Sequence, residues 1–341
     1  MNVSYLRDFQ ATSVDYERQG APMLSSPPWQ PAPAAARRPV AILLSVFNGE
    51  SFLAAQLHSY LSQTHDDWTL HWRDDGSSDA SVRVVGRFAA EAGDGRCVFH
   101  TEDGRRQVTR SFLALLRAAR ASDAAYFAFS DQDDVWLPDK LARGVAALDN
   151  VSGAEPALYC SGRVLVDGDL RGHRAPGRLR RPPGFPTALT QNIAPGCSMM
   201  LNRAAADLVL SSQPPETTWH DWWCYITVAA AGGHVLIDRN TTVLYRQHAN
   251  NLVGETRSWW RRGIAALRRG PGPFMSVLRQ HVATLQAQPE LLPESTQQQL
   301  AVIADALNGS RIARLKTLFL PGFVRQTWLE TVVFRVWFLL G

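Results

Sequence analysis

The sequence predicts an α/β fold with a Rossmann-like, mainly parallel sheet flanked by helices. From residue 40 onward, short apolar runs alternate with segments of helical periodicity. This alternation is typical of strand–helix–strand units with right-handed crossovers. The chain has 341 residues, of which 45% are hydrophobic and 19% charged, so it is long enough to bury a full core.

Residues 1–38 are predicted to be a disordered extension. They are rich in Pro, Ala and Ser and lack the apolar segment of a signal peptide. We expect the catalytic domain to span 39–254, beginning near Val40, and a C-terminal helical region to span 255–341.

Seven elements are expected in the first part of this domain. The run Val40-Ala-Ile-Leu-Leu-Ser45 is apolar throughout, as a strand buried on both faces requires. Segments with a helical spacing of apolar residues follow each of the first three strands. The expected order is strand 40–45, helix 51–63, strand 68–72, helix 78–90, strand 97–100, helix 111–119 and strand 124–129.

Three of these strands end in polar loops. Ser45-Val-Phe-Asn-Gly49 follows the first strand, Arg73-Asp-Asp-Gly-Ser-Ser-Asp79 the second, and Asp131-Gln-Asp-Asp134 the fourth. Ligands bind at the carboxyl ends of parallel strands, so these loops predict the site. The second loop is also compatible with a plain turn and a serine N-cap. If it is functional, Asp74 or Asp75 can accept a hydrogen bond from a pyrimidine N–H or a ribose hydroxyl.

The loop after the fourth strand concentrates negative charge. Asp131, Asp133 and Asp134 follow a buried apolar run. Carboxylates crowded at a buried strand end repel one another and lose hydration, and a divalent cation relieves both effects. The sequence therefore predicts a metal site here.

Composition excludes some other classes of protein. The net charge is only +4, and Lys140 and Lys316 are the only lysines among 35 basic residues, so nothing favours nucleic-acid binding. The four cysteines show no zinc-binding spacing. They are expected to be reduced thiols in a cytoplasmic protein.

The motifs resemble those of a bacterial family 2 glycosyltransferase of the GT-A fold, close to the rhamnosyltransferase-like group. They cover residues 40–254 in the family order, and their combination is specific. The motifs are Leu44-Ser-Val-Phe-Asn-Gly-Glu50, Trp72-Arg-Asp-Asp-Gly-Ser-Ser-Asp79, Ser130-Asp-Gln-Asp-Asp-Val-Trp136, His220-Asp-Trp-Trp223 and Tyr245-Arg-Gln-His-Ala-Asn-Asn251.

This resemblance implies an inverting transfer of a sugar from a nucleoside diphosphate donor, dTDP-L-rhamnose or a UDP-sugar, in cell-surface polysaccharide synthesis. It also implies that Asp131 and Asp133 hold Mg²⁺ or Mn²⁺, with Asp134 in support and His248 completing the shell. A hard cation on oxygen ligands suits the charge of a departing diphosphate.

The resemblance further implies that Asp221 is the catalytic base, which deprotonates the acceptor hydroxyl. The alternative is that Asp221 only caps the helix that begins beside it. Donor contacts are implied for seven residues: Ser45, Phe47, Asn48, Asp74, Asp75, Gln132 and Arg246. The alternative for Arg246 is a structural role.

Six further residues are expected in the acceptor or sugar pocket: Trp136, Gly196, Cys197, His220, Trp222 and Trp223. For the tryptophans, a place in the core is an equally good interpretation. His220 could also position the base or pack beside Trp219.

The C-terminal region is expected to be helical, with helices near 274–288 and 294–320. Arginines and tryptophans interleave from Arg257 to Arg269, which suits an anionic membrane surface. Charged residues interrupt the apolar runs, so no spanning helix is predicted. The region either contacts the inner face of the plasma membrane, where a lipid-linked acceptor would lie, or packs on the catalytic domain or on a second copy of the chain.

Two other classes of function stay open at this stage. A nucleotidyltransferase acting on sugar phosphates could use the same fold and aspartates, but residues 45–50 lack the Gly-rich loop with a lysine. A non-catalytic nucleotide-sugar-binding scaffold could keep the fold without the chemistry, although the carboxylates are intact.

Overall fold

The structure is a computed structural model that describes residues 38–101, 104–172, 179–248 and 270–341. Residues 38–341 form one compact unit. The extension expected over 1–38 lies outside the described residues apart from Arg38. The same holds for the expected domain boundary at 254 and for the segment Arg257 to Arg269.

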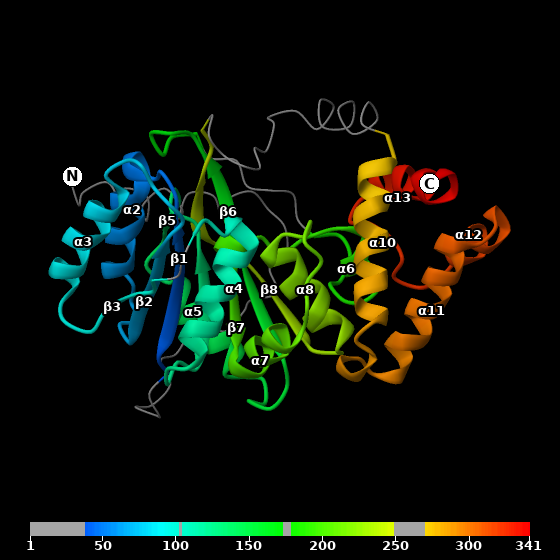
Figure 1. The fold of residues 1–341 in the computed structure, drawn as a ribbon, viewed down its shortest axis with the longest axis horizontal. Coiled ribbons are helices and arrows are strands. Elements are labelled where there is room, and N and C mark those ends of the chain that lie inside the picture. The colour runs from blue at the N-terminus through cyan, green and yellow to red at the C-terminus, as the bar shows by residue number, and fades with distance from the viewer. Residues whose placement is uncertain (1–37, 102–103, 173–178, 249–269) are drawn as a thin grey trace, which may run out of the picture. The chain divides into compact units, whose positions relative to one another are not determined.

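An eight-stranded sheet forms the centre of the unit, in the order β3-β2-β1-β4-β7-β6-β8-β5 (Figure 1). β1 pairs in parallel with β2 and β4, and β2 with β3. β7 is antiparallel to both β4 and β6, whereas β8 is parallel to β6 and antiparallel to β5. The expected parallel sheet is thus present in β3-β2-β1-β4, and the other half is mixed. The strands are β1 (Val40–Val46), β2 (Trp68–Asp74), β3 (Cys97–Phe99), β4 (Tyr126–Ser130), β5 (Val135–Trp136), β6 (Ala157–Val166), β7 (Met199–Asn202) and β8 (His234–Arg246).

Helices cover both faces of this sheet. Ala41 and Leu43 of β1 pack in the cluster with α4, α7 and α8, and Ile42 and Leu44 pack in the cluster with α2, α3 and α5. This alternation follows from the strand geometry, which points successive side chains to opposite faces. These helices are α2 (Glu50–Leu61), α3 (Ser81–Ala92), α4 (Gln107–Arg120), α5 (Lys140–Leu148), α7 (Arg203–Ser211) and α8 (His220–Ala230).

The C-terminal helices extend the cluster that contains α4 and α8. Phe334 and Phe338 belong to this cluster, and His281 packs against Trp222 with ring centroids 4.8 Å apart. The expected helix over 294–320 is divided at Gly309. The remaining helical elements are α6 (Thr187–Thr190), η2 (Gly196–Ser198), α10 (Gly272–Gln286), η3 (Pro289–Leu291), α11 (Glu294–Asn308), α12 (Arg311–Thr317) and α13 (Trp328–Leu340). Among the described residues, none of the helices combines the length and apolar character needed to cross a bilayer.

The strand register brings the three polar loops to one edge of the sheet. Val46 is paired with Asp74, and Leu44 with Ser130. The N–H of Asp75 also donates to the carbonyl of Val46 at 2.7 Å. The loops that follow β1, β2 and β4 are therefore neighbours, as the fold class predicts.

The turn between α8 and β8 requires a glycine. A Cβ on Gly233 would lie 2.5 Å from the carbonyl oxygen of Pro156, and a main-chain atom cannot easily give way.

We expect Gly233→Ala to lower the free energy of unfolding by about 1–3 kcal/mol. Gly86→Ala is the control. Gly86 lies in α3 with nothing within 4 Å of its Cβ position, so this substitution should raise the free energy of unfolding by about 0.5–1 kcal/mol. Urea unfolding monitored by circular dichroism measures both, and equal values would contradict the prediction.

Candidate active site

Gln132 joins the loop after β4 to the loop after β1. Its side-chain amide accepts the N–H of Phe47 and donates to the carbonyl of Phe47, each at 2.9 Å. A Cβ on Gly49 would lie 2.4 Å from Gln132 Oε1, so a glycine is needed for this approach. These bonds fix the relative position of the two loops. The expected contact between Gln132 and the donor stays a prediction.

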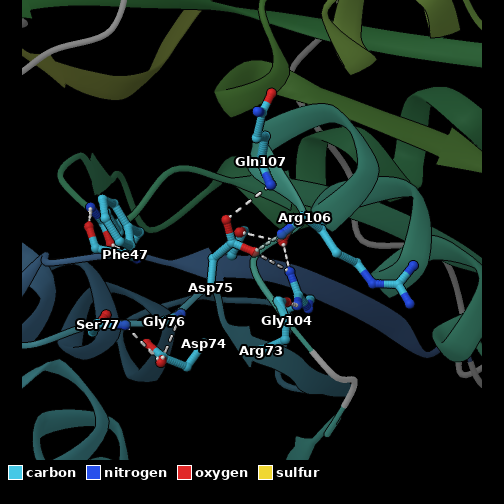
Figure 2. Close-up of polar contacts among 12 residues, drawn as sticks. Phe47, Arg73, Asp74, Asp75, Gly76, Ser77, Gly104, Arg106 and Gln107 are labelled. Atoms are coloured by element: carbon cyan, nitrogen blue, oxygen red, sulfur yellow. Dashed lines mark hydrogen bonds and ion pairs between the residues drawn. The ribbon is translucent and has the colours of Figure 1, made fainter. Parts of the chain in front are cut away.

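Asp75 joins β2 to the start of α4 (Figure 2). Its carboxylate accepts from Arg73 Nη1 at 2.7 Å and from the N–H groups of Arg106 and Gln107 at 2.7 and 3.1 Å. Asp75 is 5% exposed, and these N–H groups begin a helix, where a negative charge is favourable. The carboxylate is therefore engaged in holding the fold, and its expected role in donor binding stays a prediction.

Asp74 differs from its neighbour. Its side chain points away from that of Asp75, and Oδ2 accepts the N–H groups of Gly76 and Ser77 at 3.1 and 2.9 Å (Figure 2). Oδ1 is buried and has no hydrogen-bond partner among the described residues. Because a buried acceptor without a partner is unfavourable, Asp74 has one oxygen suited to a ligand N–H or O–H.

The other residues of the first loop differ in their surroundings: Ser45 is hydrogen-bonded within the fold, whereas Asn48 is exposed. Ser45 Oγ lies 2.6 Å from Ser111 Oγ, which also accepts from Arg73, so Ser45 belongs to a network inside the fold. Asn48 is exposed and adopts φ 47°, and its Oδ1 accepts the N–H of Ser78 at 2.8 Å. The guanidinium of Arg105 lies 4.1 Å from the ring centroid of Phe47. Phe47 and Asn48 thus border the open end of the sheet.

The acidic loop after β4 shows the electrostatic crowding that its sequence predicts. Burial, together with the negative charges of Asp133 and Asp221, raises the pKa of Asp131 to about 7, while the charge of Lys140 opposes this rise. Charges act at this strength only over short distances. Asp221 is therefore near Asp131, although the two residues come from different parts of the chain.

Arg246 and His248, at and beyond the end of β8, hold this loop. Arg246 Nε donates to the carbonyl of Asp133 at 2.8 Å, and the Arg246 N–H donates to Asp134 Oδ1 at 3.1 Å. Arg246 is 4% exposed, so these contacts give it a structural part beside its expected donor contact. His248 Nε2 lies 2.9 Å from Asp133 Oδ2, and its ring stacks on Phe52.

A buried cationic residue, which sequence reasoning missed, lies beneath the loop. Lys140 is fully buried, with Nζ 4.6 Å from the ring centroid of Trp136, and burial lowers its pKa to about 8. Its charge acts on Asp131, Asp134 and Cys197. Lysine tolerates such burial better than arginine because it can lose its proton. Lysine is rare in this sequence, whose other basic residues are arginines, and this rarity could have pointed to Lys140.

Asp134 belongs to this buried layer. It is fully buried, and burial raises its pKa well above the usual range. Ligand atoms of Asp131, Asp134 and Cys197 lie within 4.8 Å of one another. A thiol suits a hard cation poorly, so Cys197 is not expected among the ligands of such a cation, and the charge of Lys140 acts on both Asp131 and Asp134.

Asp221 lies in the first turn of α8. Its Oδ2 accepts the N–H of Gly196 at 3.1 Å and its Oδ1 accepts the N–H of Trp222 at 2.6 Å. The carboxylate thus does bond a main-chain N–H at the start of its helix, as the alternative interpretation requires. It also acts electrostatically on Asp131 across the site, which a capping role alone does not explain.

The aromatic pocket expected around Asp221 is not formed by the expected residues. Trp136 and Trp223 are fully buried, and Trp222 Nε1 donates to the carbonyl of Ala188 at 2.8 Å. Cys197 is also buried. Trp136, Trp223 and Cys197 pack in the core, which argues against their place in a ligand pocket. Trp222 packs against α6 but is only half-buried, so its place in the pocket stays a prediction. Trp219, by contrast, is 40% exposed, and sequence reasoning gave it only a packing role.

His220 is packed rather than presented to a ligand. Its ring lies between those of Phe112 and Phe129, with centroids 4.1 and 5.0 Å away. Neither ring nitrogen has a partner among the described residues. A Cβ on Gly196 would lie 2.7 Å from Nε2, so the ring and Gly196 are in close contact. Burial lowers the pKa of His220 to about 4, and the imidazole is therefore neutral near pH 7.

Comparison with known proteins places this site in a family. Residues 41–208 match the model described as Glycosyl transferase family 2. The dTDP-rhamnosyl transferase RfbG of Shigella flexneri is 26% identical over 228 residues, covering 63% of this chain and 75% of that protein. The putative glycosyltransferase EpsE of Bacillus subtilis is 28% identical over 177 residues, covering 42% of this chain and 62% of that protein.

Among solved structures, TarS of S. aureus in complex with UDP-GlcNAc has a TM-score of 0.56 at 12% identity. The match covers 79% of this chain and 72% of that one. TarS in complex with UDP gives a TM-score of 0.54. At this level of identity the likeness concerns the fold.

The buried His220 predicts a specific acid sensitivity. Its folded pKa of about 4 lies below the usual 6.5, so between these values the unfolded chain binds a proton that the folded chain does not. Stability falls as the pH falls through this window, by about 1.4 kcal/mol per pH unit near pH 5 for this group. His220→Leu should remove this contribution to the pH dependence of the free energy of unfolding. Urea unfolding at several pH values measures that dependence. An unchanged slope would refute the assignment.

Proposed function

We propose that the chain is a metal-dependent, inverting family 2 glycosyltransferase of the GT-A fold, since residues 41–208 match the family 2 model and the fold resembles that of TarS. It transfers a sugar from a nucleoside diphosphate to a saccharide or a lipid-linked saccharide in the synthesis of a cell-surface polysaccharide. The observation that carries this proposal is that the acidic loop after β4 and the carboxylate of Asp221 in α8 lie close enough for the negative charges of Asp133 and Asp221 both to act on Asp131.

The donor is dTDP-L-rhamnose or a UDP-sugar. The relative RfbG is a dTDP-rhamnosyl transferase, and TarS has been solved with UDP-GlcNAc. Both nucleotides carry a pyrimidine base with a ring N–H. The buried Oδ1 of Asp74, which has no partner among the described residues, supplies an acceptor for that group. Phe47 and Asn48 lie beside it at the end of β1.

The acidic loop fits Mg²⁺ or Mn²⁺. The raised pKa of Asp131 reflects carboxylates that repel one another in a half-buried place, and oxygen ligands of this kind suit a hard cation. Asp131 and Asp133 would hold the ion, with His248 beside Asp133 at 2.9 Å. When bound, the cation would neutralise the negative charge on the departing nucleoside diphosphate.

Asp221 is the catalytic base. The N–H groups of Gly196 and Trp222 hold its carboxylate at the start of α8, so its orientation is fixed before an acceptor arrives. The carboxylate accepts the proton of the acceptor hydroxyl while that oxygen attacks the anomeric carbon. Gln132, Arg246 and Lys140 do not react. They hold the loops in place.

Replacing the base tests its role. Asp221→Asn keeps an oxygen that can accept the Gly196 N–H but cannot take a proton at neutral pH. We expect sugar transfer to fall by about 10²- to 10⁴-fold, measured as nucleoside diphosphate released in the presence of acceptor. Donor binding, measured by thermal shift, should be unchanged. Transfer at the normal rate would show that another group is the base.

A nucleotide panel tests the metal and the donor together. Thermal shift with dTDP, UDP, GDP and their sugars, with Mn²⁺ or with EDTA, should show stabilisation only for a bound donor. A ligand at 100 times its Kd adds about 2.7 kcal/mol. Asp133→Asn should abolish the part of the thermal stabilisation that depends on Mn²⁺. Asp123→Asn is the matched control, because Asp123 precedes β4 and lies at the opposite end of the strand. Equal shifts with and without metal would refute metal dependence.

A further inference from the structure

The outward side of α13 is as apolar as its buried side. Thr331, Phe334, Trp337 and Phe338 face the core. Leu329, Val332, Val336 and Leu340 follow one another at intervals of three and four residues, so they share the other face of the helix. They are 49%, 37%, 47% and 65% exposed, and Trp328 at the start of the helix is 73% exposed.

The neighbouring helix α12 also carries exposed apolar side chains. Ile312, Leu315 and Phe319 are 67%, 49% and 77% exposed. Arg314 Nη1 donates to the carbonyl of Phe338, and Arg335 Nη2 donates to that of Leu318, each at 3.4 Å, so the two helices are held together (Figure 1). We name these eight exposed apolar residues the α12–α13 face: Ile312, Leu315, Phe319, Trp328, Leu329, Val332, Val336 and Leu340.

Positive charge surrounds this face. Residues 311–341 contain five basic residues, Arg311, Arg314, Lys316, Arg325 and Arg335, and one acidic residue, Glu330. Arg311, Lys316 and Arg335 are exposed. Glu330 is engaged with Thr327 in the capping box of α13. The net charge of this segment is therefore +4.

We propose that the α12–α13 face binds an anionic phospholipid surface. Exposed Leu, Val, Ile and Phe side chains beside a Trp and several cations have the composition of an interfacial membrane-binding helix. Each cation near such a surface adds to the attraction. A second copy of the chain fits less well, because two copies of this face would bring like charges together.

The α12–α13 face is tied to the base side of the active site. The Gln326 N–H donates to Gln191 Oε1 at 3.0 Å, and Gln191 Nε2 donates to Glu330 at 3.4 Å. The segment after Gln191 leads to Gly196, whose N–H holds Asp221. The start of α13 is therefore connected through Gln191 to the loop that holds the proposed base. This last step rests on the proposed function, whereas lipid binding itself does not.

The experiment is sedimentation of the full chain with vesicles of phosphatidylcholine alone or mixed with phosphatidylglycerol. Binding is expected only with phosphatidylglycerol, and it should weaken as the salt concentration rises. The triple variant Val332→Ser, Val336→Ser, Leu340→Ser should lower the partition coefficient by at least about 10-fold. Arg311→Gln with Lys316→Gln should lower it by about 30-fold, since each surface cation contributes about a factor of five.

Matched controls separate this face from general surface hydrophobicity. Val82→Ser in α3 and Val302→Ser in α11 remove side chains that are 44% and 47% exposed, and binding should not change. Nucleotide-induced thermal shift of each variant shows whether the fold and the donor site are intact. If the folded wild-type chain does not bind phosphatidylglycerol vesicles, the inference is wrong while the proposed activity stands. Dimerisation in solution that the triple variant abolishes, without vesicle binding, would also overturn it.

Discussion

The repulsion among carboxylates at the end of β4 is the constraint on which the rest of the site depends. Asp131, Asp133 and Asp134 occupy four consecutive positions with Gln132, and burial raises the pKa of both Asp131 and Asp134. Such a loop keeps one conformation only if other parts of the chain hold it. Arg246 binds its main chain and Asp134 from β8. Lys140 supplies a buried positive charge from α5.

Polar residues of the same motif divide into those that hold the loops and those left for chemistry. Asp75 and Gln132 have their side chains engaged by main-chain groups of neighbouring loops. Asp74 retains a buried oxygen without a partner among the described residues. Such division is expected where a site is built from loops, because loops need tertiary bonds to position the reacting groups. A motif alone does not show which residue has which role.

The elements predicted from residue 40 to 130 agree with the structure because local pattern decides them. β1 and β4 are almost wholly buried, and parallel strands covered on both faces read as continuous apolar runs. Helix α4 begins at Gln107 rather than near Ser111, since Asp75 accepts the N–H groups that open it. The antiparallel insertion of β7 between β4 and β6 was not predicted, because pairing between distant strands leaves little trace in a local pattern.

The sequence by itself determined the α/β class, the strands that end in polar loops and the crowding of carboxylates after β4, because spacing and residue type carry that information. Tertiary structure alone decided which side chains are accessible. It buried Trp136, Trp223 and Cys197, and it left Trp219 and the outer side of α13 exposed. The reason is that burial depends on which elements pack together, and the residues that cover a given side chain are distant in sequence.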